Sequence, residues 1–268
     1  MSHPRLSVSE MCTYPWGFGD ELALWEELGV RRVGVISAKL EAYGTDRAVS
    51  ALGERSMQAT TVITRSFDLS APDTWDAARV GINAAIDLAG QIGGCVYFTP
   101  GRRDGRSFDE LTASLAEAVQ PCAIYAAAAG VRLAIEPSLR TDVSFVHTLR
   151  DGLDVAEAAG IDVIADLGNC WMERDYEKTV RRAGPRLACV QFADAIFGTS
   201  TEPPPGGRAV PGDGDLPIDK FLLAALEAGY EGVFELEQVG PKIEAEGHEP
   251  ALRRAVERAS CLLEEVLR

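Results

Sequence analysis

Short β-type runs alternate with helical stretches along the whole chain. The β-type runs are Leu6–Val8, Arg32–Ile36, Thr60–Arg65, Cys95–Thr99, Arg132–Glu136, Val163–Asp166, Leu187–Phe192 and Gly232–Glu237. The helical stretches include Asp73–Ala89, Phe108–Ala129, Phe145–Ala159, Ile218–Ala228 and Pro250–Leu267. This alternation is typical of parallel strands joined by right-handed crossovers. Eight such units in a chain of 268 residues predict an α/β fold, a single (β/α)8 TIM barrel.

Glycines mark the ends of several predicted helices. Gly29, Gly130, Gly160 and Gly229 each follow a helical run directly, and a strand begins two or three residues later. Glycine is favoured there because a helix often ends on a residue in the left-handed conformation. No linker divides the chain, so we expect one domain over residues 1–268. We interpret the Pro- and Gly-rich stretch Glu202–Gly214 as a long loop at the active-site end of the seventh strand.

Composition and charge narrow the classes of protein that the chain can belong to. The formal net charge of −15 disfavours binding to nucleic acid, because such a field repels phosphate backbones. No apolar run approaches the roughly 18 residues that span a bilayer, and the N-terminal segment lacks the layout of a signal peptide. The six cysteines form no CxxC pair, and most of them are interpreted as core residues. We therefore expect a cytoplasmic protein with neither a membrane nor a nucleic-acid partner.

Polar side chains occupy the C-terminal ends of the last four predicted strands, where a (β/α)8 barrel carries its catalytic groups. They are Glu136 on the fifth strand, Asp166 and then Asn169 on the sixth, Gln191 and then Asp194 on the seventh, and Glu235 and Glu237 on the eighth. Strand alternation puts Glu235 and Glu237 on one face, so Glu235 lies one layer deeper if Glu237 points into the barrel mouth.

This gathering of oxygen donors is the main indication of chemistry in the chain. Burying three or four such groups together, most of them carboxylates, is very costly without a cation. A divalent metal ion is the simplest compensation, and oxygen ligands suit Mn²⁺, Mg²⁺ or Co²⁺. The alternative is that each acid caps a helix or pairs with an arginine, which is weaker for four consecutive strands than for one.

The same residues carry a resemblance to a known family. The matching segments are LAIEPSLRTDVSFVHTL (Leu133–Leu149), IADLGNCW (Ile164–Trp171), VQFADA (Val190–Ala195), VPGDGDLPIDKFL (Val210–Leu222) and GYEGVFELE (Gly229–Glu237). In these segments the chain is similar to the xylose isomerase-like TIM-barrel superfamily, in particular its sugar phosphate isomerase/epimerase branch. The match covers nearly the whole chain, and its specific motifs lie in the second half.

The resemblance implies one divalent metal ion held by Glu136, Asp166, Gln191 and Glu237. Mn²⁺ is the first candidate, and Mg²⁺, Co²⁺ or Zn²⁺ are alternatives. Gln191 stands where histidine is common in relatives. Its carbonyl oxygen can still bind a hard cation, but the affinity for Zn²⁺ should fall. Asn169 stands where many relatives have another histidine, which puts proton transfer through that position in doubt.

The resemblance also implies a reaction, namely isomerisation or epimerisation of a sugar or keto-polyol through an enediolate. The metal polarises the carbonyl and hydroxyl oxygens, one carboxylate removes a proton and the other returns it. Glu136 and Glu237 are the candidate catalytic residues. Relatives are often dimers or tetramers, so a homo-oligomer is compatible with the resemblance.

Several other residues are candidates for binding the small carbohydrate-like substrate. Arg208 matches an arginine often found near the substrate in the family, and Asn169 lies beside the predicted ligands. Trp16 and Trp171 can form walls for a sugar ring, although such residues also pack loop against loop. Two histidines complete the set of candidates. His147, in the first turn of the predicted fifth helix, can act as a base, and His248, before the last helix, can line the mouth.

Three other functions stay open. The first is a metal-dependent lyase on the same scaffold, either a keto-inositol or dehydroshikimate dehydratase or a C-glycoside deglycosidase, since these also begin with proton abstraction beside a carbonyl. The second is an apurinic endonuclease, which three histidines and the negative charge oppose. The third is a non-catalytic barrel subunit, which the departures at Gln191 and Asn169 would favour.

Overall fold

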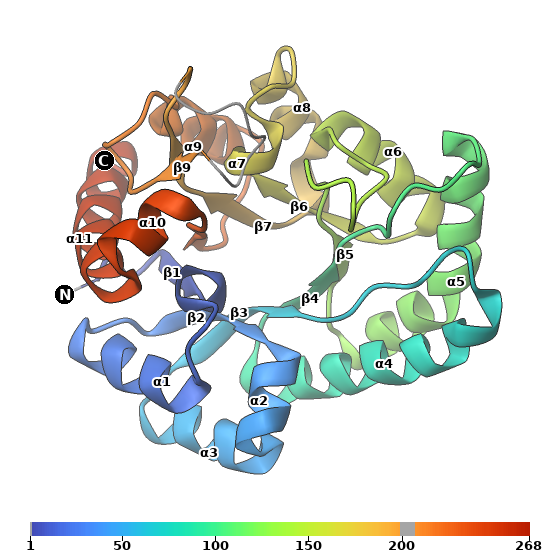
Figure 1. Ribbon diagram of the computed structural model, residues 1–268, viewed down its shortest axis with the longest axis horizontal. Helices are drawn as coiled ribbons and strands as arrows, with labels where there is room; N and C mark the ends of the chain where they lie inside the picture. The colour runs from blue at the N-terminus through green and yellow to red at the C-terminus, as the bar shows by residue number, and fades with distance from the viewer. Residues whose placement is uncertain (1, 199–206) are drawn as a thin grey trace.

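The structure is a computed structural model that describes residues 2–198 and 207–268. Eight parallel strands close into a barrel in the order β1-β10-β7-β6-β5-β4-β3-β2, with helices around it (Figure 1). The barrel strands are β1 (Leu6–Ser9), β2 (Arg32–Ile36), β3 (Gln58–Ile63), β4 (Cys95–Phe98), β5 (Leu133–Ile135), β6 (Asp162–Asp166), β7 (Leu187–Phe192) and β10 (Phe234–Leu236). The predicted single (β/α)8 TIM barrel is confirmed, and every predicted strand is present.

The helices fill the connections between the strands. They are α1 (Phe18–Glu27), α2 (Ser37–Tyr43), α3 (Thr45–Glu54), α4 (Trp75–Ile92), α5 (Phe108–Ala129), α6 (Leu149–Ala159), α7 (Leu167–Cys170), α8 (Tyr176–Ala183), α9 (Ile218–Glu227), α10 (Pro241–Glu246) and α11 (His248–Val266), with the 3-10 turns η1 (Glu10–Thr13), η2 (Pro72–Thr74) and η3 (Gly184–Arg186). Gly130 and Gly160 end α5 and α6 with φ of 68°, as the glycine pattern predicts. Within the described residues, no helix is both long enough and apolar enough to cross a membrane.

One helix begins later than the sequence suggests. Thr148 caps α6, because its side chain accepts a hydrogen bond from the backbone N–H of Asp151 at 3.0 Å. The helix therefore starts at Leu149 rather than at Phe145. The prediction that His147 lies in the first turn of this helix is wrong, since His147 lies in the loop that precedes it. The prediction that His248 precedes the last helix is also wrong, since α11 begins at His248 itself.

The segment after β7 carries a small hairpin that the sequence does not predict. Strand β8 (Asp194–Ala195) pairs antiparallel with β9 (Arg208–Ala209). The predicted loop Glu202–Gly214 lies partly outside the described residues, which resume at Gly207. The hairpin brings Arg208 back to the barrel end of β7, so this connection places a cation beside the strand ends.

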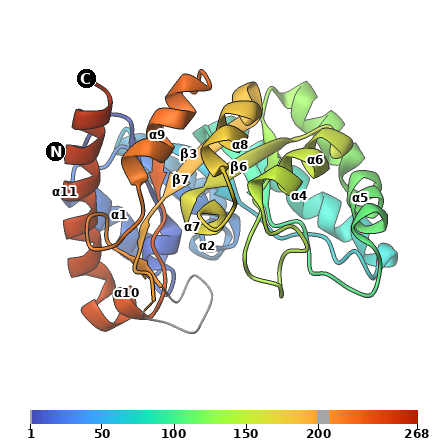
Figure 2. The same ribbon diagram turned by 90° about the horizontal axis from the view of Figure 1, so that it is seen from above.

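The core lies in two layers, one between the strands and the helices and one inside the barrel. The smaller, inner cluster is formed by Cys95, Tyr97, Ala134, Ile164 and Cys189. The two chain ends meet on one side, where the backbone N–H of His3 donates to the Ser260 hydroxyl of α11 at 3.0 Å (Figure 1, Figure 2). The inner cluster forms a floor beneath the polar strand ends.

Candidate metal centre

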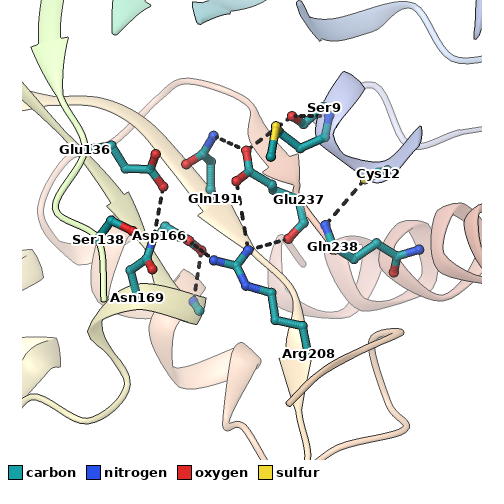
Figure 3. Close-up of polar contacts among 12 residues, drawn as sticks. Ser9, Cys12, Glu136, Ser138, Asp166, Asn169, Gln191, Arg208, Glu237 and Gln238 are labelled. Atoms are coloured by element: carbon teal, nitrogen blue, oxygen red, sulfur yellow. Dashed lines mark hydrogen bonds and ion pairs between the residues drawn. The ribbon is translucent and has the colours of Figure 1, made fainter. Parts of the chain in front are cut away.

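Three carboxylates meet at the C-terminal end of the barrel. Glu136 follows β5, Asp166 ends β6 and Glu237 follows β10. All three are buried, and each offers an oxygen that lies within 4.8 Å of those of the other two (Figure 3). Because β10, β7, β6 and β5 are neighbours in the barrel, their ends converge on one point. The structure thus brings the three predicted acidic ligands together.

Gln191 lies between these acids on β7 and is fully buried. Its Nε2 donates to Glu237 Oε2 and to Glu235 Oε1, both at 3.0 Å. Its Oε1 is buried and has no hydrogen-bond partner among the described residues. Figure 3 shows this oxygen on the side that faces Glu136 and the nitrogen on the side that faces Glu237. No donor in the described part of the chain therefore bonds to the predicted ligand atom of Gln191.

Asn169 connects two of the carboxylates. Its Nδ2 donates to Glu136 Oε1 at 2.9 Å and to Asp166 Oδ2 at 2.8 Å. The residue lies on α7, a single turn that Asp166 itself caps by accepting from the backbone N–H of Gly168 at 2.9 Å. Asp166 thus caps the start of α7 and, together with Glu136, accepts a hydrogen bond from the amide of Asn169.

Arg208 brings one positive charge into the cluster. Its Nη2 donates to Asp166 Oδ2 at 2.6 Å, and its Nη1 donates to the backbone carbonyl of Glu237 at 2.8 Å. The guanidinium lies against Gly168, where an added Cβ would be 2.6 Å from Arg208 Cζ. Asp166 therefore follows the alternative considered from the sequence, in which a strand-end acid pairs with an arginine. Glu136 and Glu237 accept their side-chain hydrogen bonds from other residues.

The two glutamates hold their protons more tightly than exposed ones. Burial, followed by the charges of Glu237 and Asp166, raises the pKa of Glu136 well above its ordinary value. Burial, followed by the charge of Asp166, raises the pKa of Glu237 to about 8. Arg208 lowers both pKa values, but one guanidinium does not balance three carboxylates. The site as built carries excess negative charge, which a proton or a cation must offset.

The donor set fits a hard divalent cation. Carboxylate oxygens and one amide oxygen are the ligands that Mn²⁺ and Mg²⁺ prefer, whereas Zn²⁺ favours nitrogen and sulfur. The unpaired Oε1 of Gln191 supports the fit, because a buried carbonyl oxygen without a donor is rare unless an ion or water completes it. Glu136, Asp166, Gln191 and Glu237 are thus the residues that can hold the ion.

Comparison with known proteins identifies the family of the chain. Residues 22–262 match the family model described as the xylose isomerase-like TIM barrel. The chain belongs to this family. No curated protein sequence matches the chain.

Solved structures of low sequence identity share the fold of this xylose isomerase-like chain. The IOLI protein, crystallised with a zinc atom, has a TM-score of 0.83 and 17% identity, with 99% of each chain covered. D-Psicose 3-epimerase from Clostridium cellulolyticum H10, solved with D-tagatose, has a TM-score of 0.73 and 16% identity, over 100% of this chain and 98% of the other. The E. coli 3-keto-D-glucoside 4-epimerase has a TM-score of 0.75 and 16% identity, over 97% and 99%. At these identities the likeness shows the fold alone.

Two hydroxyl groups of the site are absent from the sequence prediction. The Tyr97 hydroxyl lies 3.1 Å from Gln191 Nε2 and 3.4 Å from Glu237 Oε2. Ser9 Oγ donates to Glu237 Oε2 at 3.2 Å. Burial, followed by the charges of Glu237, Glu136 and Glu235, raises the pKa of Tyr97 well above its ordinary value, so the phenol stays protonated. Tyr97 and Ser9 lie near the ends of β4 and β1, and this position alone could have indicated them. The sequence prediction rests on acidic and amide side chains at strand ends, and these two residues are neither.

The remaining candidates have other neighbours. His147 Nδ1 lies 2.8 Å from the Ser138 carbonyl, and His248 Nδ1 lies 3.1 Å from the Cys12 carbonyl. Trp16 lines a cavity of about 540 Å³ together with Lys39 and aromatic side chains of the β1 and β2 connections. Trp171 stacks on Phe197 with ring centroids 4.7 Å apart. Among the described residues, no hydrogen bond joins these four side chains to the three carboxylates.

Proposed function

We propose that this chain is a divalent-metal-dependent isomerase or epimerase that moves a proton next to a carbonyl group of a sugar or keto-polyol. The observation that carries the proposal is the convergence of Glu136, Asp166 and Glu237, with oxygens within 4.8 Å of one another. The family supports it, since structural relatives include a D-psicose 3-epimerase and a 3-keto-D-glucoside 4-epimerase. The substrate in this proposal is a small carbohydrate-like molecule.

The proposed metal ligands are Glu136, Asp166, Gln191 and Glu237, and Mn²⁺ is the proposed ion. A bound divalent ion polarises a carbonyl oxygen as a Lewis acid and so acidifies the neighbouring C–H. The protein residues have to bind the substrate, hold the carboxylates in place and carry the proton.

Glu136 and Glu237 are the proposed acid–base pair. Asn169 donates to Glu136 Oε1 and thereby leaves Oε2 for the proton that is removed from carbon. Ser9 donates to Glu237 Oε2, and Oε1, which has Arg208 Nη1 at 4.0 Å, is the proposed atom for transfer on the other side.

Arg208 is the proposed substrate-binding cation. Its Nε is buried and has no hydrogen-bond partner among the described residues, so one donor of the guanidinium is available to a substrate oxygen. Trp16, Trp171, Asn169 and His248 remain proposed substrate contacts, and His147 remains a proposed base. The lyase alternative uses the same carboxylates, and a role as the base for His147, whose Nδ1 lies 2.8 Å from the Ser138 carbonyl, would favour it over the isomerase.

The test is proton exchange in deuterated water. Protein loaded with Mn²⁺ is incubated with 2-keto and 3-keto sugars, and NMR follows deuterium at the carbons beside the carbonyl. We expect deuterium in a recovered or epimerised sugar. Loss of water or of an aglycone would instead identify a lyase. If the ion binds and no α-hydroxy ketone exchanges, the proposal is wrong.

A further inference from the structure

The amide of Gln191 is held by hydrogen bonds at its nitrogen end only. Three acceptors surround Nε2, namely Glu235 Oε1 at 3.0 Å, Glu237 Oε2 at 3.0 Å and the Tyr97 hydroxyl at 3.1 Å. The opposite atom, Oε1, is buried without a partner among the described residues and faces Glu136 (Figure 3). The surroundings of the amide therefore differ sharply between its two ends.

Glu235 is the acceptor that no proposed catalytic or metal-binding step uses. It is fully buried, one layer below Glu237, and its register partner on β7 is Gln191. Its carboxylate accepts hydrogen bonds from the hydroxyls of Ser7, Thr60 and Thr61 at 2.6–3.1 Å as well as from Gln191. Such a set of donors fixes a carboxylate in a single position.

The barrel also keeps space for this carboxylate. A Cβ added at Gly34 on β2 would lie 2.5 Å from Glu235 Oε2 and 2.6 Å from Thr61 Oγ1. A strand interior normally disfavours glycine, which there marks a close approach of another group. Gly34 leaves room for the Glu235 carboxylate, and the three hydroxyls fix it in place. The carboxylate then accepts its remaining hydrogen bond from Gln191.

We infer that Glu235 is a positioning residue that fixes the amide of Gln191 with its oxygen toward the metal ion. The inference rests on the proposed function, because it assigns a role within that metal site. With the amide reversed in the metal-bound site, Oε1 would face the ionised carboxylates of Glu235 and Glu237, and repulsion would replace the two hydrogen bonds that Nε2 donates to them. Glu235 therefore excludes the reversed amide. Of the two ends of the Gln191 amide, only the oxygen is then presented to the metal ion.

This role has a consequence for the choice of metal. A fixed amide oxygen favours hard ions such as Mn²⁺, while a freely rotating amide presents its NH₂ group part of the time and cannot then bind a cation. Partners that orient a metal ligand typically change metal affinity by about 10- to 100-fold when they are removed. The same range is expected for Glu235.

The experiment is a double-mutant cycle on metal-free protein. Glu235→Gln, Gln191→Ala and the double variant are titrated with Mn²⁺, and free Mn²⁺ is counted by electron paramagnetic resonance up to millimolar concentration. We expect Glu235→Gln to weaken Mn²⁺ binding about 10- to 100-fold when Gln191 is present and less than about twofold when residue 191 is alanine. Circular dichroism and thermal unfolding report whether each variant is folded.

The cycle separates positioning from simple loss of charge. An equal loss of affinity in both backgrounds means that Glu235 acts only through its charge, and this overturns the inference, as does unchanged affinity in folded Glu235→Gln. Glu21→Gln is the matched control, because Glu21 is also fully buried but bonds to Thr13 and Lys39. If Glu235→Gln does not fold, Gly34→Ala displaces the Glu235 carboxylate and enters the same cycle. Wild-type protein that binds no Mn²⁺ would instead refute the proposed function itself.

Discussion

At the scale of single residues, the three strand-end acids differ in what holds them. Asp166 has Arg208 Nη2 at 2.6 Å and Glu136 has one amide donor. Glu237 has hydroxyl and amide donors and lies farther from the guanidinium, with Arg208 Nη1 at 4.0 Å from its Oε1. A carboxylate paired with arginine is a poor base, whereas one held by neutral donors retains its basicity. The two glutamates are therefore better suited to move protons than the aspartate.

This difference gives the first prediction. Glu136→Gln and Glu237→Gln should each lower kcat by at least about 10²-fold, since an amide cannot exchange the proton, while the isosteric side chain leaves the fold intact. Steady-state kinetics on any substrate that exchanges deuterium provides the measurement. Glu41→Gln, at an exposed position on α2, is the control. A variant that keeps more than a tenth of the wild-type kcat would remove that glutamate from the acid–base pair.

The second prediction concerns the ligand that departs from the family pattern. Gln191→Ala should weaken Mn²⁺ binding, and Gln191→His should raise the affinity for Zn²⁺ relative to Mn²⁺ by at least about tenfold, because imidazole is a softer ligand than an amide oxygen. Competitive titration calorimetry measures both ions. Unchanged Mn²⁺ titration of folded Gln191→Ala would take Gln191 out of the ligand set.

A third prediction comes from a buried acid outside the metal centre. Burial, followed by the charge of Glu21, raises the pKa of Glu10 to about 9. The pKa is about 4.3 in the unfolded chain, so the folded state binds this proton more tightly than the unfolded state does. This proton's contribution to the free energy of unfolding is complete below about pH 4.3 and is lost as the pH rises through 9. Glu10→Gln keeps the neutral form at every pH. Its free energy of unfolding should therefore fall less than that of the wild type between pH 6 and pH 9.

Urea denaturation of metal-free protein at a series of pH values checks this prediction. Glu244→Gln, at an exposed position on α10, should keep the wild-type slope. Identical slopes for Glu10→Gln and the wild type would mean that Glu10 is already ionised at pH 6.

At the scale of the elements, the sequence predicts the strands well because each is an apolar run between helix stops. All eight predicted strands are present, and Leu187–Phe192 and Phe108–Ala129 have the predicted bounds. The strand ends also give the acidic residues of the site, because parallel strands direct their C-terminal ends to one rim. These features depend on residues that are near one another in the sequence, so they can be predicted without knowledge of long-range contacts.

Other parts of the site depend on contacts that no local pattern encodes. The roles of Tyr97 and Ser9 are set by strands far apart in the sequence that meet only when the barrel closes. The start of α6 was predicted four residues too early, since apolar Phe145 and Val146 are buried in a loop and mimic helical periodicity. The contact between Arg208 and Asp166 depends on the β8–β9 hairpin, whose partners are separated by the long connection.

Asp194 holds this hairpin and supports a fourth prediction. Its carboxylate accepts hydrogen bonds from the backbone N–H groups of Ala195, Gly212, Gly214 and Leu216 at 2.8–3.0 Å. Asp194→Ala leaves these donors unpaired, so the free energy of unfolding should fall by about 2–4 kcal/mol. Because the hairpin carries Arg208, KM should rise as well.

Urea denaturation and steady-state kinetics measure the two effects. Asp213→Ala is the matched control in the same loop, since Asp213 forms ion pairs with Arg254 and Arg258 at the surface. Loss of surface pairs should lower the free energy of unfolding by less than about 1 kcal/mol. Equal losses in the two variants would mean that Asp194 does not hold the hairpin.

At the scale of the whole molecule, metal binding and folding should be linked. The barrel closes over three buried carboxylates and one arginine, so the folded protein offers a site that the unfolded chain lacks. An ion that binds only the folded state stabilises it by about 2.7 kcal/mol at a concentration of 100 times its Kd, which is roughly 5–10 °C in Tm for a chain of this size. Mn²⁺ should therefore raise Tm, and EDTA should reverse the effect.

The size of this shift should depend on pH, because the ligands must lose their protons before they bind. The pKa of Glu237 is about 8 in the metal-free fold, above its value in the unfolded chain, so metal-free protein should lose stability as the pH rises from 5 to 8. Mn²⁺ competes with protons, so its apparent affinity should increase over the same range. Differential scanning calorimetry at fixed Mn²⁺ should then show a larger Tm increase at pH 8 than at pH 6. A shift that is equal at both pH values would mean that Glu237 is not protonated in the metal-free site or does not bind the ion.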